Sequence, residues 1–387
     1  MNRKTDYLKT YEIIAGIILV ITTILFLKTP NMLYTLMDSD ISKIFWDFKS
    51  HINFTADLKN TYSTSMHACF PPLIYLFYHF LYLIIPKVDN IDMLYNFVYA
   101  IYLSVMFITF SYICSKMLEK ESFTKRLTAT VLFALSAPFV FGIIEQGNIV
   151  LLPMMLLAVA ALWRDSENKV KRELALIFIA VAAGIKVYPA IFGIIYLAEK
   201  RYKEAIRLII YGILFFFVPF VFTGGIDGMI TFFNNQSAVH QAWGKYSLVS
   251  IYSYAIFFDL GKKIGIILSA LFGCIALITV FFTKSMWQKY FMIAFIMVMC
   301  PLWSGQYTVC FFLIAFFAFL QSNQTLNNKF YDNIYIIMFS LIFSANILTK
   351  KVGAMKITGP VFIIFFVILL QNIAEIKGNT KPVSKIE

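Results

Sequence analysis

The chain has 387 residues, of which 60% are hydrophobic, 18% aromatic and only 14% charged. This composition excludes a soluble globular domain, because apolar stretches of membrane-spanning length recur from residue 11 to residue 372. The net charge of +12 resides in short segments between those stretches. That placement argues against a nucleic-acid partner and points to membrane lipids.

The recurring apolar stretches predict an all-α polytopic membrane protein, because a helix satisfies its own backbone hydrogen bonds in lipid. The first stretch is long and lacks a small-residue cleavage site, so it is predicted to be a span and not a signal peptide. Residues 1–372 are expected to form one membrane domain. Spans are predicted near 11–29, 91–115, 127–144, 149–163, 173–185, 188–198, 206–223, 264–283, 286–302, 308–321, 333–348 and 357–372.

The segment 70–85 is ambiguous between a span and an interfacial or re-entrant helix. The positive-inside rule favours the interfacial helix, because the loop 116–126 is then cytoplasmic. Both termini are then cytoplasmic, and residues 30–90 and 224–263 form the two large external segments. The tail 373–387 is polar and basic and is predicted to be disordered. Every arginine falls inside: Arg3, Arg126, Arg164, Arg172, Arg201 and Arg207.

Neither the cysteines nor the histidines predict a metal centre or a disulfide framework. The five cysteines lack CxxC spacing, and the four histidines form no close pair. No P-loop or other soluble-enzyme motif occurs in a fitting context. The chain is therefore expected to work without a metal or a cofactor.

Two polar islands interrupt the apolar sequence: Glu145-Gln146-Gly147-Asn148, and Lys186 in the run GIKVYPA. Ionisable groups at membrane depth cost roughly 2.5–3.5 kcal/mol on insertion scales, which makes them candidates for a functional site. Lys186 fits two interpretations, because a lysine near a helix end also snorkels to the interface. The segment 173–198 is too long for one span, and Pro189 predicts a break within it.

Under this topology the external ends bring several polar groups to one side: the acids of residues 38–57, both islands, and the run Trp303-Ser304-Gly305-Gln306-Tyr307. A carboxylate can accept the proton of an attacking hydroxyl, and a lysine can hold a phosphate. Aromatic rings and amides suit sugars. The alternatives are a solvated loop acid at Asp47 and aromatic-belt anchors at Trp303 and Tyr307. Asn235-Gln236-Ser237 is a weak glycosylation sequon.

The run from Gly142 to Arg207 resembles glycosyltransferase family 87, a family of polyprenol-phosphate-sugar-dependent enzymes in the C-type superfamily. Lys186-Val187-Tyr188-Pro189 is similar to the family's Lys-x-x-Pro, and Gln146-Gly147-Asn148 is similar to its Gly-Gln-x-Asn with a shift of order. Phe70-Pro71-Pro72-Leu73 resembles the Tyr-Pro-Pro-Leu that opens a membrane-surface helix. The resemblance implies the C-type fold, with about 10–13 transmembrane helices of ~20 residues each.

The run from Cys300 to Tyr307 is similar to the family's Ser-Pro-x-Ser-Trp-x-His-His segment, with Gln306 and Tyr307 in place of the two histidines. The resemblance implies a catalytic aspartate in the first external segment. Asp47 ranks first because of its Trp-Asp-Phe context, and Asp40 ranks second because of its spacing to Pro71.

The sequence therefore leads to the hypothesis of an inverting, plasma-membrane glycosyltransferase. It is expected to move a hexose, mannose-like by the resemblance, from a polyprenyl-phosphate donor to a lipid-linked or cell-envelope glycan on the external face. The expected substrate contacts are Lys186, Tyr188, Gln146, Asn148, Glu145, Trp303, Gln306 and Tyr307. A transporter or flippase of lipid-linked sugars, and a non-catalytic partner in envelope polysaccharide assembly, are the rival interpretations.

Overall fold

The computed structural model describes residues 6–28, 45–63, 68–86, 91–243, 249–322, 329–345 and 350–378. Every regular element among these residues is a helix. The first half of the chain forms α1 (Tyr7–Lys28), α3 (Trp46–Phe54), η2 (Leu58–Ser63), α4 (Pro72–Ile84), α5 (Ile91–Met117), α6 (Phe123–Ala134), η3 (Pro138–Glu145), α7 (Leu151–Trp163), α8 (Lys169–Ile185), η4 (Tyr188–Gly193) and α9 (Ile194–Ala198).

The second half continues the all-helical arrangement, and the prediction of an all-α polytopic membrane protein is confirmed. The elements are α10 (Tyr202–Phe217), η5 (Val218–Phe222), α11 (Gly225–Trp243), α12 (Ile251–Phe257), α13 (Lys262–Phe282), α14 (Met286–Met299), η6 (Gln306–Phe311), α15 (Phe312–Gln321), α16 (Lys329–Ile342) and α17 (Lys350–Gly378).

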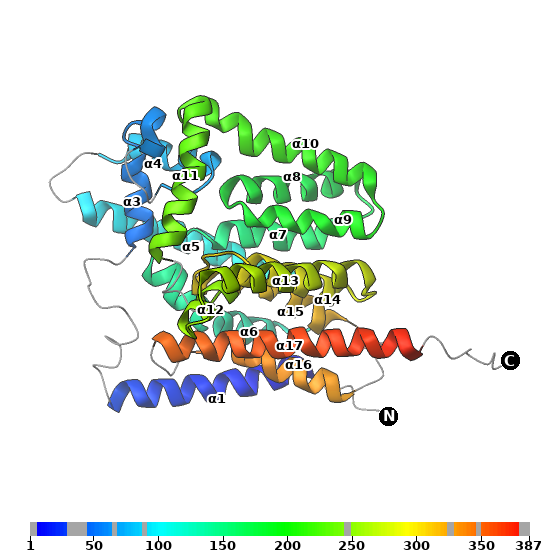
Figure 1. Cartoon of the computed structure of the whole chain (residues 1–387). Coiled ribbons are helices and arrows are strands. Elements are labelled where there is room, and N and C mark those ends of the chain that lie inside the picture. Colours follow the sequence, from blue (N-terminus) through cyan, green and yellow to red (C-terminus); the bar gives the residue numbers. More distant parts are fainter. Residues whose placement is uncertain are drawn as a thin grey trace.

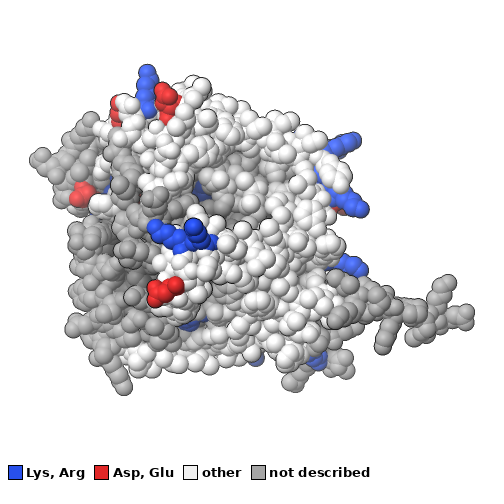
Figure 2. All heavy atoms as spheres, in the orientation of Figure 1, with Lys and Arg blue, Asp and Glu red and all other residues white. Residues whose placement is uncertain are grey.

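Five helical stretches are long and apolar enough to cross a bilayer. They cover Tyr7–Leu25, Asp92–Met117, Tyr202–Phe222, Lys262–Phe282 and Met355–Glu375. The long helices run in roughly the same direction (Figure 1), as expected for a bundle that spans a membrane. On the face in Figure 2, charged side chains gather toward the two ends and leave a band between them without charge. The remaining apolar helices have 10–17 residues each, fewer than the ~20 that a transmembrane helix needs.

The predicted span 127–144 is wrong as one continuous helix. α6 ends at Ala134, and the π-helical η3 begins at Pro138. The cause is Pro138, which supplies no backbone N–H to the preceding turn. The Ala137 N–H beside the break donates instead to the Ser344 carbonyl at 3.1 Å. The break directs the chain into the first polar island.

The predicted break within residues 173–198 is confirmed. α8 begins at an N-cap, where the Asn168 side chain accepts hydrogen bonds from the N–H groups of Val170 and Lys171. The helix ends at Ile185, and Lys186 has extended backbone with φ −139° and ψ 132°. The chain then re-enters a helical path at Tyr188, with Pro189 in its first turn. Lys186 is thus held outside both helices.

The described parts of the two predicted external segments are largely helical. Residues 30–90 contain α3, η2 and α4, and residues 224–263 contain α11 and α12. α4 has 13 residues, a length of about 20 Å, which is too short for a ~30 Å hydrocarbon layer. α3, α4, α11 and α12 lie together at one end of the bundle, and α11 runs across the direction of α10 and α13 (Figure 1). We call this end the Asp47 end.

The prediction of a disordered tail from residue 373 is wrong for residues 373–378. α17 continues to Gly378, so residues 373–378 are helical. The rest of the predicted tail, residues 379–387, lies outside the described residues. The physical reason is that Gln371 and Asn372 fasten this helix to α14: the Gln288 amide donates to Gln371 at 3.1 Å, and the Asn372 amide donates to Gln288 at 3.2 Å.

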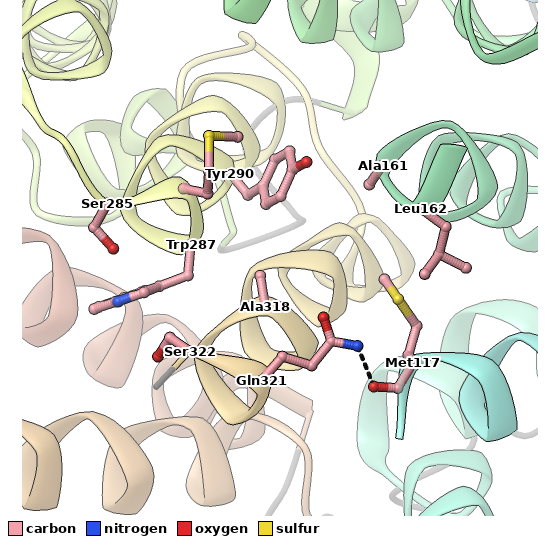
Figure 3. A pocket seen from close by; sticks show the side chains of 10 residues that line it. Met117, Ala161, Leu162, Ser285, Trp287, Tyr290, Ala318, Gln321 and Ser322 are labelled. Atoms are coloured by element: carbon pink, nitrogen blue, oxygen red, sulfur yellow. Dashed lines mark hydrogen bonds between the residues drawn. The ribbon is translucent and has the colours of Figure 1, made fainter. Parts of the chain in front are cut away.

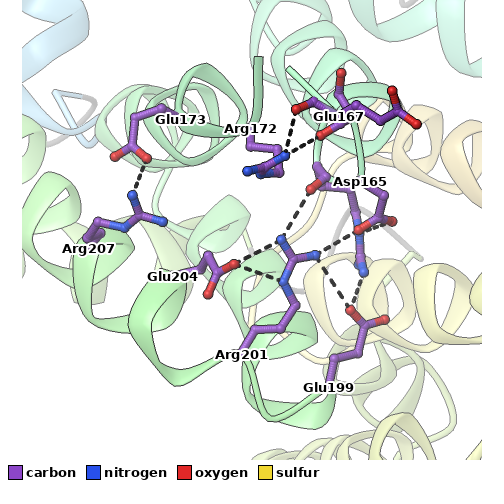
Figure 4. A network of polar contacts seen from close by, with 10 residues as sticks. Asp165, Glu167, Arg172, Glu173, Glu199, Arg201, Glu204 and Arg207 are labelled. Atoms are coloured by element: carbon purple, nitrogen blue, oxygen red, sulfur yellow. Dashed lines mark hydrogen bonds and ion pairs between the residues drawn. The ribbon is translucent and has the colours of Figure 1, made fainter. Parts of the chain in front are cut away.

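The turns after α7 and α9 lie at the opposite end of the bundle, which we call the Arg164 end (Figure 1), and they contain a polar network (Figure 4). Arg164 follows α7, is 3% exposed and pairs with Glu199 and Asp165. Arg201 bonds Asp165 at 2.7 Å and Glu204 at 3.1 Å. Because these residues come from the turns after α7 and α9, the network fixes two helix hairpins to each other. It contains equal numbers of acids and bases, counting Lys289, which lies 3.6 Å from Glu199.

Candidate functional site

Asp47, the first-ranked candidate base, lies in the first turn of α3 and is half-buried. Its carboxylate accepts a 2.8 Å hydrogen bond from the side-chain amide of Asn148. Its backbone N–H donates to the Gln146 carbonyl at 3.0 Å. The first polar island therefore binds both the main chain and the side chain of the candidate base.

The amide of Asn148 is itself held in one orientation. The side chain is 1% exposed, and its oxygen accepts a 3.1 Å hydrogen bond from the Val150 N–H at the start of α7. With the oxygen engaged in this way, the nitrogen must face Asp47. A buried amide that donates to a carboxylate orients the acceptor without neutralising it, so the arrangement suits a positioned base.

Gly147 allows the island to approach α3 closely. Its φ of +73° lies in the left-handed region, and a Cβ added there would lie 2.7 Å from the Phe45 Cα. Only glycine meets both conditions without strain. Phe45 also has a positive φ, of 60°, and precedes α3 as its N-cap. Two tight turns thus dock against each other beside Asp47.

Lys186, the second polar island, is buried between aromatic rings. It is 4% exposed, its Nζ lies 3.4 Å from the centre of the Phe70 ring, and the Tyr307 ring centre is 5.6 Å away. Among the described residues, no acid lies within ion-pair distance of this ammonium. A cation held only by ring faces retains its capacity to donate to an anion.

Phe70 is placed between two nitrogen-bearing side chains. The His51 imidazole stacks on it with 3.9 Å between ring centres, and the Lys186 ammonium lies 3.4 Å from the same centre. Both groups cannot occupy one face at these distances, so they lie on opposite faces. His51 is buried and shares a 3.0 Å hydrogen bond with the Tyr75 hydroxyl. The ring that covers Lys186 is therefore supported from behind.

Asp47 and Lys186 belong to one site, because each interacts electrostatically with Cys69. Asp47 also interacts with Tyr307, whose ring lies near Lys186. Tyr307 is 3% exposed and stands in the first turn of η6. The turn before it is fixed by a 2.7 Å hydrogen bond between the hydroxyls of Ser304 and Thr308. Four distant parts of the chain thus meet at the Asp47 end.

The other residues expected to contact the substrate differ in how far they are buried. Tyr188 packs its ring against Phe311, and its hydroxyl is buried without a partner among the described residues. Trp303 is half-buried, with its ring centre 6.4 Å from that of Tyr307. Gln306 begins η6 and is half-buried, and so is Gln146. Two further candidates, Asp40 and the side chain of Glu145, lie outside the described residues.

The sequence alone missed Phe70, His51 and Cys69 as neighbours of the site. Phe70 stands directly before Pro71-Pro72, so its place at the start of a membrane-surface helix was the available signal. His51 follows Asp47 by one helical turn, which places both on one side of α3. Cys69 carries no such signal, because a lone cysteine in a polar segment indicates no particular contact.

A cavity of about 280 Å³ lies far from these residues (Figure 3). It is lined by Met117, Leu162, Trp287, Tyr290 and Gln321 among others. Met117 ends α5, whose first turn contains Asp92, the partner of Lys49 on α3 at 3.9 Å. A helix of this length places its two ends about 37 Å apart. The cavity therefore belongs to the Arg164 end and is not the site described above.

The described residues contain no group of three or more histidine, cysteine or acidic side chains that could hold a metal ion. The expectation of metal-free chemistry stays a prediction. What the arrangement offers is an oriented carboxylate, a nearby ammonium and aromatic faces. These groups can deprotonate a hydroxyl, hold a phosphate and stack on a sugar, respectively.

Comparison with known proteins gives one match. The family model of glycosyltransferase family 87 matches residues 70–344, which include Asn148, Lys186 and Tyr307 but not Asp47. No curated protein and no solved structure matches the chain. The matched region covers well over half of the chain and runs from the start of α4 to the end of α16. The chain is therefore a membrane protein that belongs to glycosyltransferase family 87.

Proposed function

We propose that this glycosyltransferase moves a hexose from a polyprenyl-phosphate donor to a glycan or glycolipid acceptor, with inversion at the anomeric carbon. The acceptor hydroxyl oxygen attacks that carbon, and the bond from the carbon to the phosphate oxygen breaks. Asp47 accepts the hydroxyl proton, and polyprenyl phosphate leaves with the bonding electron pair. No metal or cofactor takes part.

The observation that carries this proposal is the hydrogen bond from Asn148 to Asp47. It ties an acid in the first external segment to a polar island inside the family-matched region. A half-buried, oriented carboxylate suits a general base, because it is accessible to a substrate and fixed in direction. Asp40 remains the second candidate for this role.

Lys186 supports the phosphate part of the proposal. A buried ammonium without an acidic partner is costly, and an anion that binds there would offset the cost. The departing phosphate carries more charge as the carbon–oxygen bond breaks, so a fixed cation beside it stabilises the transition state more than the ground state. The direct electrostatic attraction between Lys186 and Asp47 agrees with two groups acting on one substrate.

The sugar part of the proposal rests on the aromatic groups near Lys186. Tyr307 and Trp303 form an edge-to-face pair, and such rings pack against the CH groups of a hexose. Tyr188 has a buried hydroxyl without a partner among the described residues, which is a donor that a sugar hydroxyl can satisfy. We infer a hexose because the aromatic rings can pack against the CH groups of a sugar ring, while separate polar groups can bond its hydroxyls.

The Asp47 end is proposed to face the outside of the plasma membrane. The charge distribution supports this orientation, because the Arg164 end contains Arg164, Arg172, Arg201 and Arg207. Membrane lipids surround the apolar band, and the acceptor is a lipid-linked or cell-envelope glycan. The donor then reaches the site from the outer leaflet.

The test is a transfer assay with the purified protein in lipid and a panel of polyprenyl-phosphate sugars. The wild-type protein is expected to transfer one hexose to a glycolipid acceptor. D47N is expected to lose about 100-fold or more in rate, since a general base contributes 10²–10⁴-fold. D57N is the matched control, because Asp57 is an exposed acid of the same external segment.

A D47N variant with full activity would reject Asp47 as the base, and the same result in D47N/D40N would reject an acid in this segment. A flippase makes a different prediction, because it moves the donor across the membrane without consuming it. Donor translocation without a glycosylated product would therefore replace the proposal by that rival.

A further inference from the structure

α11 makes an amide contact with the segment that carries Phe70. The Asn235 amide nitrogen donates to the Tyr62 carbonyl at 2.9 Å and to the Ala68 carbonyl at 3.0 Å. The next residue, Gln236, donates from its amide nitrogen to the Cys69 carbonyl. Two neighbouring amides therefore bind three carbonyls of the first external segment, which is about 170 positions away in the sequence.

The contact is buried, as expected for one that fixes a position. Asn235 is 9% exposed, and the Tyr62 ring packs edge-to-face on Phe232, which is fully buried one turn earlier on α11. The Tyr62 hydroxyl in turn donates to the Phe70 carbonyl at 2.9 Å. A hydrogen bond in such surroundings is costly to lose, because the carbonyls left behind have no water.

Asn235 is also the asparagine of the weak glycosylation sequon. In the folded chain its amide nitrogen already donates to two carbonyls. A nitrogen engaged in this way cannot carry a glycan without unfolding of this contact. The adjacent Asn234 is exposed but is not followed by the sequon spacing, since Ser237 is three positions later. The Asn-Gln pair therefore has a role inside the fold.

Phe70 follows the bound carbonyls directly and is the ring that covers the Lys186 ammonium at 3.4 Å. We propose that Asn235 and Gln236 are positioning residues of the donor site: they fasten the segment 68–70 to α11 and so hold Phe70 over Lys186. This inference rests on the proposed role of Lys186 as the phosphate contact. Loss of the amides frees Phe70, leaves the ammonium without its fixed ring and weakens donor binding.

Cys69 gives a readout that does not depend on activity. Its own carbonyl accepts the Gln236 hydrogen bond, and burial raises the pKa of its thiol to about 11, while Lys186 lowers that pKa and Asp47 raises it. Because only the thiolate reacts, a maleimide should modify Cys69 slowly while the segment is held. Release of the segment exposes the thiol and returns its pKa toward about 8.5, which accelerates labelling.

The experiment compares N235D and Q236E with N234D in the full-length protein in lipid. The two test variants keep the size of the side chain but remove the donor, whereas N234D makes the same change at an exposed neighbour on the same helix. N-ethylmaleimide labelling of each cysteine is followed by peptide mass spectrometry. Labelling of Cys69 is expected to rise roughly tenfold or more in N235D and Q236E, and not in N234D.

Kinetics of the same variants separate positioning from general support of the fold. The KM for a polyprenyl-phosphate sugar is expected to rise about tenfold, which is about 1.4 kcal/mol, while kcat stays within about twofold. An unchanged Cys69 labelling rate in both test variants overturns the inference. Equally faster labelling of the core cysteines Cys114 and Cys310 also overturns it, because that result would show loss of the whole fold.

Failure of the proposed function is distinguishable from failure of this inference. If the wild-type protein uses no polyprenyl-phosphate sugar, the proposed function is wrong. Labelling of Cys69 still decides whether α11 holds the segment, because that measurement needs no substrate.

Discussion

The side-chain amide of Asn148 donates a 2.8 Å hydrogen bond to the carboxylate of Asp47, and so joins residues 101 positions apart. Asn148 is fixed by the start of α7, and Asp47 begins α3. The hydrogen bond therefore connects the start of the apolar helix α7 to an element of the predicted first external segment. It also places the candidate base beside the region that the family model covers.

The first prediction concerns this hydrogen bond. Asn148→Ala removes the donor and leaves the carboxylate without its orienting partner. A hydrogen bond to a charged group contributes about 1.5–3 kcal/mol, so kcat/KM is expected to fall roughly 10- to 100-fold. Asn60→Ala serves as the control, because Asn60 is an exposed partner of Asp57 in the same external segment. Equal kcat/KM values for the Asn148→Ala and Asn60→Ala variants would show that Asn148 has no role in the reaction.

The second prediction concerns the close approach at Gly147. Gly147→Ala adds a Cβ that would lie 2.7 Å from the Phe45 Cα, at a φ of +73°. The two turns must separate, so we expect lower activity and a stability loss of about 1–3 kcal/mol. Gly212→Ala is the matched control, since Gly212 lies within α10 and has nothing within 4 Å of an added Cβ. Transfer assays and thermal unfolding in detergent measure both effects.

The third prediction separates function from stability at Lys186. Lys186→Met removes a buried cation that has no acidic partner among the described residues. The melting temperature is expected to stay the same or rise, because a buried charge is costly, while transfer falls by about 100-fold or more. Lys356→Met provides the contrast. Lys356 donates to the Ser344 hydroxyl at 2.8 Å, so its replacement should lower the melting temperature. A strongly destabilised Lys186→Met protein would indicate a structural lysine instead.

The fourth prediction concerns the network at the Arg164 end. Arg164→Met removes a buried guanidinium and its bonds to two acids, while Asp165 keeps Arg201 and Glu199 keeps Lys289 as partners. The lost hydrogen bonds between charged groups should cost about 1.5–3 kcal/mol of unfolding free energy. Arg207→Met breaks the pair with Glu173, whose members are 46% and 29% exposed, and should cost under about 1 kcal/mol. Activity per folded molecule should persist in both variants, since neither residue lies at the Asp47 end. Chemical denaturation and specific activity test this pair of outcomes.

The fifth prediction is a pH dependence from the Asp6–Lys125 ion pair near the start of α1. Burial alone would raise the pKa of Asp6, but the bonds from Lys125 and the Lys9 N–H outweigh burial and lower it. The contact with Asp6 raises the pKa of Lys125, against the opposing effect of burial.

The direction in which each group's stabilising contribution changes with pH follows from the linkage between proton binding and folding. The Asp6 contribution is present above the unfolded pKa of about 3.9 and is lost as pH falls through the lower folded pKa. The Lys125 contribution is present below about 10.4 and is lost as pH rises through the higher folded pKa. In Lys125→Met, the free energy of unfolding should therefore fall less steeply at both the acidic and the basic end of the pH range. The difference between variant and wild-type unfolding, measured from pH 3 to pH 11, checks this result; a constant difference would contradict it.

Local features of the sequence were enough to predict the class of the protein and one break. Apolar length and composition decide membrane insertion, because each segment partitions largely by its own hydrophobicity. Pro189 supplies no backbone N–H to a preceding turn, so a break near Lys186 was also predictable. The span 127–144 and the external segment 224–263 were predicted less well. A π-helical turn and helices of mixed polarity leave a weaker periodic signal.

The sequence by itself determined a helical membrane protein with two polar islands, because hydrophobic length, proline and charge act within a few residues. Only the tertiary structure decided that Asn148 contacts Asp47, that Phe70 covers Lys186, and that Asn235 is buried against Ala68. These partners are far apart in the chain. Their meeting depends on how the helices pack around α3 and α11, and patterns within a few residues do not reveal that packing.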